Sequence, residues 1–142
     1  MMNPATPDKK KTWLRFTGLV LGMGILVWLP VEETSELGAL VISGLICTWC
    51  GVWLLLKPAP DDKHLIMRYV LVGGGAGLLL APLAMLLLAF KSGIHGHGTP
   101  DYTVSQLRDV LCRIPYFVLG GSLVGLGSGL WRFAKRDPSQ EE

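Results

Sequence analysis

The four long apolar runs in this sequence contain no Asp, Glu, Lys or His, although 17% of the chain is charged. The runs are residues 13–29, 37–56, 65–90 and 114–133. Proton-coupled transporters need an ionisable group within the membrane to couple ion to substrate. A haem held between two helices needs histidine ligands at the same depth. The missing side chains therefore argue against both classes of protein.

The length of the runs predicts the fold. At about 1.5 Å per residue, helices of these lengths extend roughly 25–39 Å, against a hydrocarbon core of about 30 Å. Helices satisfy every backbone polar group within one segment, as lipid requires. No small-x-small cleavage pattern follows the first run, so it is expected to be an uncleaved span. We predict an all-α integral membrane protein, with residues 1–142 forming a single domain of four transmembrane helices.

The Lys and Arg residues lie unevenly between the predicted loops. One side of the membrane receives ten: Lys9, Lys10, Lys11, Arg15, Lys57, Lys63, Arg68, Arg132, Lys135 and Arg136. The other side receives three: Lys91, Arg108 and Arg113. Cytoplasmic loops carry the excess of positive side chains in membrane proteins. Both termini are therefore predicted to be cytoplasmic, in a multi-pass protein of the cell (inner, cytoplasmic) membrane.

The long loop between the third and fourth runs contains a predicted short helix at residues 104–113. Thr103 and Gln106 have the spacing of a capping box, in which each side chain accepts a bond from the other residue's backbone amide. Val104, Leu107 and Leu111 then share one face at helical spacing. We expect an amphipathic helix that lies in the outer membrane interface.

The same loop begins with the sequence HGHGTPDYT, at residues 95–103. His95 and His97 have the spacing of two ligands for Zn²⁺ or Cu²⁺, but Asp101 is the only carboxylate close in sequence and a metal site needs more ligands. We expect no metal and no other cofactor. The loop is instead predicted to dock a partner protein through six residues: His95, His97, Asp101, Tyr102, Thr103 and Arg108.

The three cysteines give little support for redox chemistry. Cys47 and Cys50 form a C-x-x-C about ten residues into the second run, where no cation or base is near to stabilise a thiolate. A disulfide relay with the outer loop needs a second pair there, and that loop has only Cys112. The pair is expected to pack against a neighbouring helix.

Glycines recur at intervals of four in three of the runs. Such spacing places small patches on one helix face, so that two helix backbones can approach closely. We therefore predict helix-packing faces in the first, third and fourth runs, made by Gly18, Gly22, Gly73, Gly77, Gly121, Gly125 and Gly129. Pro82 follows the glycines of the third run and predicts a bend in that helix.

These features favour a binding protein over an enzyme, so no catalytic residue is expected. The leading hypothesis is a non-enzymatic accessory or assembly subunit of a larger membrane complex. Its partners are the lipid bilayer and other membrane proteins or further copies of the chain, and nucleic acid is not among them. One alternative is an oligomeric channel for ions or small solutes. A second is a membrane redox or metal-handling protein that uses His95, His97 and the cysteines.

Overall fold

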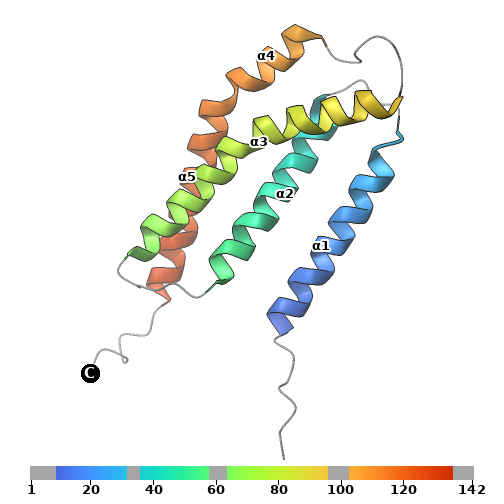
Figure 1. Ribbon diagram of the computed structural model, residues 1–142. Coiled ribbons are helices and arrows are strands. Elements are labelled where there is room, and N and C mark those ends of the chain that lie inside the picture. Colours follow the sequence, from blue (N-terminus) through green and yellow to red (C-terminus); the bar gives the residue numbers. More distant parts are fainter. Residues whose placement is uncertain (1–8, 32–35, 58–63, 96–102, 136–142) are drawn as a thin grey trace, which may run out of the picture. The chain divides into compact units, whose positions relative to one another are not determined.

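The computed structural model describes residues 9–31, 36–57, 64–95 and 103–135, and within these ranges it contains helices and no strand. The helices are α1 (Lys9–Trp28), α2 (Glu36–Leu56), α3 (Leu65–His95), α4 (Val104–Cys112) and α5 (Ile114–Ala134) (Figure 1). The prediction of an all-α fold is confirmed for this part of the chain. Helix α4 occupies the position predicted for the short helix in the long loop.

Three helical segments of the described ranges are long and apolar enough to cross a membrane: Glu36–Leu56, Leu65–Ile94 and Val104–Ala134. The third of them joins α4 and α5, which are separated only by Arg113. The apolar part of α1, Thr12–Trp28, is shorter. Large apolar side chains are exposed along all of these helices, as expected for surfaces that face lipid.

The contacts divide the chain into two units, residues 1–32 and 33–142. In the described part of the first unit α1 is the only helix, and its Thr17 hydroxyl donates to the carbonyl of Leu14 at 2.9 Å. This bond satisfies the polar side chain within its own helix. The second unit contains α2, α3, α4 and α5.

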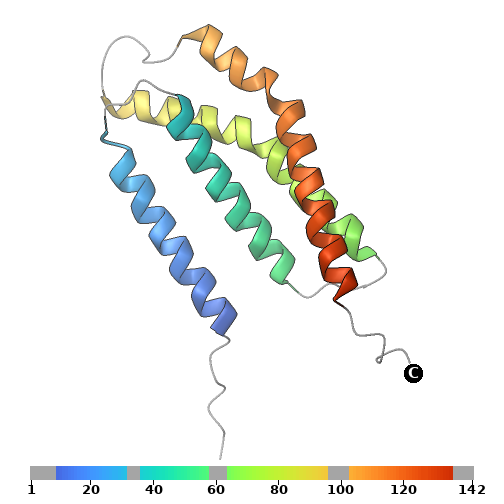
Figure 2. The same ribbon diagram turned by 180° about the vertical axis from the view of Figure 1, so that it is seen from behind.

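Helix α3 is the centre of the second unit. Both α2 and α5 pack on it, and its contact with α5 is the more extensive. Figures 1 and 2, which view the unit from opposite sides, show α3 and α5 crossing each other at close range. The fold therefore depends on how the faces of α3 match the helices on either side.

Glycines let the backbones of α3 and α5 touch. A Cβ atom added at Gly73 would collide with the carbonyl oxygen of Gly121, and one added at Gly121 would collide with that of Gly73. A Cβ at Gly125 would likewise collide with the carbonyl of Tyr69, and a Cβ at Gly77 would collide with a carbonyl of α5. Hydrogen is thus the only side chain that fits along this crossing.

A second row of small residues holds α2 against α3. The buried residues of α2 are Ala39, Ser43, Cys47 and Gly51, which recur every four residues on one face. A Cβ added at Gly51 would lie 3.3 Å from Val72 of α3, which is tighter than most real contacts. The Ser43 hydroxyl donates to the carbonyl of Ala39 at 2.7 Å, so its burial leaves no polar group unpaired.

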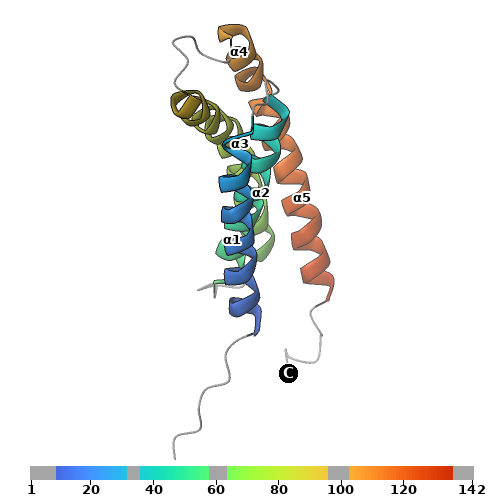
Figure 3. The same ribbon diagram turned by 90° about the vertical axis from the view of Figure 1, so that its right-hand side faces the viewer.

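Helix α3 is longer than predicted and is bent. It contains Pro82, and it changes direction along its length, so that its second half leans away from α5 (Figures 1 and 3). Proline removes one backbone donor and crowds the preceding turn, which accounts for the bend. The helix runs to His95, whereas the apolar run that predicted it ends at Phe90.

Two polar links join the helix ends of the second unit. The guanidinium Nη2 of Arg68 donates to the carbonyls of Leu54 at 2.6 Å and Lys57 at 2.7 Å, which are among the last carbonyls of α2. At the opposite end of α2, Glu36 pairs with Arg113 at 3.4 Å. The first link adds a side-chain donor at the C-terminal end of α2, where carbonyls lack the amides of a further helical turn.

The glycine crossing predicts a steep response to substitution at Gly125. We expect Gly125→Leu to reduce the free energy of unfolding by about 1–3 kcal/mol or more, the range for overpacking a tight contact. The physical reason is the collision of any Cβ with the Tyr69 carbonyl. Unfolding by denaturing detergent, followed by circular dichroism, measures the change.

Gly127→Leu is the matched control for this variant. It adds the same side chain to the same helix, but a Cβ at Gly127 meets no atom within 4 Å. We expect this control to unfold with nearly the parent free energy. Equal destabilisation by the two variants would show that the crossing contributes no more than the rest of the helix surface.

Candidate functional site

Helix α4 is fixed at its start by the capping box that the sequence predicts. The Thr103 hydroxyl accepts a bond from the Gln106 amide at 3.4 Å, and the Gln106 side chain accepts one from the Thr103 amide at 2.8 Å. Two of the amides that a helix N-terminus leaves unpaired are satisfied in this way. Local sequence therefore specifies where α4 begins.

Helix α4 buries one residue beside the apolar face that is predicted to lie in the membrane interface, and that interfacial position stays a prediction. Val110 is its one fully buried residue, with no exposed surface, whereas Val104 is 83% and Leu111 40% exposed. Helix α4 contacts both α3 and α5. Near the end of α3, Leu88 and Lys91 are each 2% exposed. Val110 is thus buried where α4 packs on α3 and α5.

The predicted docking residues are divided between described and undescribed parts of the chain. His95 is the last residue of α3, not a loop residue as predicted, because that helix continues past Phe90. Thr103 is the N-cap of α4, and Arg108 is exposed on that helix. Three others, His97, Asp101 and Tyr102, lie outside the described residues. Within the described ranges, no group of three or more His, Cys, Asp or Glu residues is placed to hold a metal ion.

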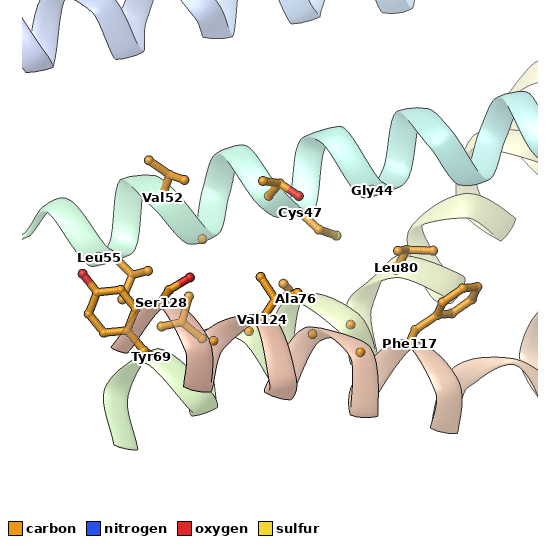
Figure 4. A pocket seen from close by; sticks show the side chains of 18 of the residues that line it. Gly44, Cys47, Val52, Leu55, Tyr69, Ala76, Leu80, Phe117, Val124 and Ser128 are labelled. Carbon is orange, nitrogen blue, oxygen red and sulfur yellow. The ribbon is translucent and has the colours of Figure 1, made fainter. Parts of the chain in front are cut away.

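A groove of about 680 Å³ lies between α2 and α5, with α3 as its floor (Figure 4). Its lining is mostly apolar. Glycines from all three helices contribute to the lining and leave space for the groove: Gly44, Gly51, Gly73, Gly77, Gly120, Gly121 and Gly125. The volume falls within the range of about 300–1,000 Å³ that small-molecule sites occupy. The groove is thus large enough to take an apolar group.

The two ends of the groove differ in chemistry. Leu80 and Phe117 lie at one end, and Tyr69 and Ser128 lie at the other (Figure 4). Arg132 also lines the groove and donates from Nη1 to the Tyr69 hydroxyl at 2.5 Å. A cation therefore lies at the end of the groove that Tyr69 marks.

Of the two cysteines of α2, both of which are expected from the sequence to pack against a neighbouring helix, only Cys47 does so. Cys47 is 8% exposed and lies in the row of small buried residues, while Cys50 is exposed on another face. Cys112, at the end of α4, is also exposed, and all three cysteines are free thiols. The location of Cys47 agrees with a packing role, and its redox inertness stays a prediction.

The predicted glycine faces have different surroundings. In the second unit, Gly73, Gly77, Gly121 and Gly125 meet backbone atoms across the α3–α5 crossing, and a Cβ at Gly129 would lie 3.2 Å from the Cβ of Tyr69. In the first unit, a Cβ added at Gly22 meets no atom within 4 Å. Helix packing by Gly18 and Gly22 therefore stays a prediction.

Two features that carry the arrangement were not recognised in the sequence. The buried row on α2 has the same spacing of four as the glycine rows, but it combines Ala, Ser, Cys and Gly. A search for any small residue at this spacing would find it. The groove has no comparable signal, since its lining alternates among three helices that are distant in sequence.

Taken together, the described helices include three segments long and apolar enough to cross a membrane, and the second unit is built on α3, with the short helix α4 and an apolar groove. No protein-family model, curated protein or solved structure matches this chain. Inferences about function therefore depend on the geometry of α4 and of the groove.

The capping box predicts how α4 responds to substitution at Thr103. We expect Thr103→Ala to destabilise the helix by about 0.5–2 kcal/mol, the usual effect of removing an N-cap side chain. Faster amide hydrogen exchange in residues 104–112 would measure this change. Thr103→Ser keeps the hydroxyl and should exchange like the parent. Equal protection in the Ala and Ser variants would mean that packing alone, through Val110, determines the stability of α4.

Proposed function

We propose that this chain is a non-enzymatic accessory or assembly subunit of a larger membrane complex and that it contacts its partner through α4. The supporting observation is that α4 is held in place from two directions and still presents an apolar surface. Its start is fixed by the Thr103 capping box and its inner face by the buried Val110. The opposite surface, with Val104 and Leu111 flanking Arg108, is exposed.

The length of α5 supports a position for α4 outside the hydrocarbon core. Helix α5 has 21 residues and extends about 32 Å, which is already the thickness of the core. Helix α4 precedes α5 with one residue between them. The C-terminal end of α4 therefore lies at the boundary of the core, and the rest of α4 lies outside it. Exposed residues such as Arg108 and Asp109 suit that depth, because a charge within the core is costly.

A partner accounts for the composition of the exposed face of α4. Protein interfaces combine apolar residues with arginine and are poor in lysine. Val104, Arg108 and Leu111 fit this composition, and a preformed helix loses less conformational freedom on binding than a flexible loop. The remaining docking residues proposed from the sequence, among them His97 and Tyr102, precede this helix in the chain.

The proposal includes the topology predicted from the charges. Four spans, including the shorter α1, place both termini on the cytoplasmic side of the cell membrane and α4 on the opposite side. The supporting observations are the ten-to-three distribution of Lys and Arg and the three long apolar helices. The partner surface of α4 then faces away from the cytoplasm.

Photo-crosslinking tests the partner directly. A photoreactive phenylalanine derivative at position 104 should crosslink in cells to one discrete protein. The control is the same group at Leu123 of α5, which is 66% exposed within a spanning segment and should crosslink to lipid. Thr103→Ala, by loosening α4, should lower the yield at position 104. The absence of a protein adduct at 104, with intact membrane levels of the chain, would refute the accessory-subunit proposal.

Single cysteines test the topology in a background without the three native ones. Cysteine at Ser35 or Thr99 should react with a membrane-impermeant maleimide in intact cells, and cysteine at Ser139 should react only after lysis. The reason is that the positive-inside rule places residues 35 and 99 opposite the terminus. Labelling at Ser139 in intact cells would reverse the orientation and place α4 in the cytoplasm.

A further inference from the structure

We propose that the groove between α2 and α5 binds one acyl chain of an anionic phospholipid, with the phosphate of that lipid at Arg132. The inference is separate from the docking role of α4, because it concerns another surface of the second unit. Three observations support it: the shape of the groove, its apolar lining and the arginine at one end.

The shape of the groove fits a single hydrocarbon chain. Along α2 it runs from Gly44 to Leu56, and along α5 from Tyr116 to Arg132, which corresponds to about 18–24 Å at 1.5 Å per residue. Dividing the volume of about 680 Å³ by this length gives a cross-section of about 28–38 Å². An extended hydrocarbon chain, whose carbon atoms keep about 3.5–4.0 Å from their neighbours, has a cross-section of roughly 12–16 Å², so one chain fits within the groove.

A helix is too wide for the same groove. With side chains its diameter is about 10–12 Å, and its cross-section is therefore roughly 80–110 Å². A helix of a partner, of a second copy or of this chain could place only a row of side chains in the groove. An acyl chain, in contrast, is narrow enough to lie inside the groove.

The charge at the Tyr69 end selects the lipid head group. Arg132 uses Nη1 to donate to the Tyr69 hydroxyl, and a guanidinium has further N–H donors for a second acceptor. Planar guanidinium donors match the oxygens of a phosphate. Tyr69 is 8% exposed, so the bond to its hydroxyl holds the arginine toward the groove.

Neighbouring cations at this end are already engaged by protein groups. Arg68 donates to the carbonyls at the end of α2, and Lys57 lies over the ring of Trp53 at 3.7 Å. These positive charges add a long-range attraction for anionic lipid, as basic residues near a membrane surface generally do. Arg132 is the cation that also lines the groove, and this makes it the expected ligand of the phosphate.

A matched pair of glycine variants tests the acyl-chain part. Gly120 lines the groove and Gly127 does not, and a Cβ at either position meets no atom within 4 Å. The parent and its variants are reconstituted in nanodiscs of phosphatidylglycerol and phosphatidylethanolamine, transferred to mild detergent and analysed by native mass spectrometry. We expect one retained phosphatidylglycerol on the parent and on Gly127→Phe. Gly120→Phe should reduce this retention at least tenfold.

A second pair tests the head-group part. Arg132→Gln and Lys135→Gln each remove one positive charge from the same end of α5, but Lys135 lies over Trp131 and is absent from the groove lining. We expect Arg132→Gln to lower the preference for phosphatidylglycerol over phosphatidylethanolamine about tenfold, as loss of a charged hydrogen bond predicts. Lys135→Gln should leave the preference within about twofold, since an exposed charge contributes little.

Several results would overturn the proposal. One is equal lipid retention by Gly120→Phe and Gly127→Phe. Another is retention of phosphatidylethanolamine as strongly as phosphatidylglycerol by the parent, which would remove the role of Arg132. A third is loss of a second copy or a partner protein, and not of lipid, in Gly120→Phe. Gly120→Ala and Gly120→Leu extend the test if the larger residue prevents folding, because retention should fall as the side chain grows.

Discussion

The backbone contact between α3 and α5 is the constraint on which the rest of the second unit depends. Lipid offers no hydrophobic drive for two apolar helices to associate, so their attraction comes from close packing. At Gly73 and Gly121 each backbone carbonyl occupies the space that the other residue's side chain would need. The reciprocity leaves little freedom for the two helices to slide or rotate. It therefore fixes where the other faces of α3 point.

The remaining elements follow from the position of α3. Its second face receives the row of small residues on α2 that ends at Gly51, and it also contacts α4. Because α2 and α5 pack on different faces of one helix, the groove forms between them. Tyr69 connects these features: its carbonyl lies against Gly125 and its hydroxyl accepts a bond from Arg132. Packing and the polar end of the groove thus depend on one residue.

Much of the fold could be predicted because the requirements of lipid are strict. Apolar runs of sufficient length gave the helices, and the Thr103 and Gln106 pair gave the start of α4. The burial of Val110 on α4 could not be predicted from apolar spacing, since it depends on how α4 packs on α3 and α5. The groove depends on the angles at which two helices cross a third. Those angles result from many small contacts, and no short sequence motif encodes them.

The bond between Arg68 and the end of α2 bears on how the chain can be divided. In addition to the connecting loop, a side chain of α3 binds the carbonyls of Leu54 and Lys57 directly. The α2–α3 junction is therefore held by a contact that survives when the covalent connection changes. It is the natural position for inserting a reporter domain, or for expressing the protein as two fragments that reassemble in the membrane.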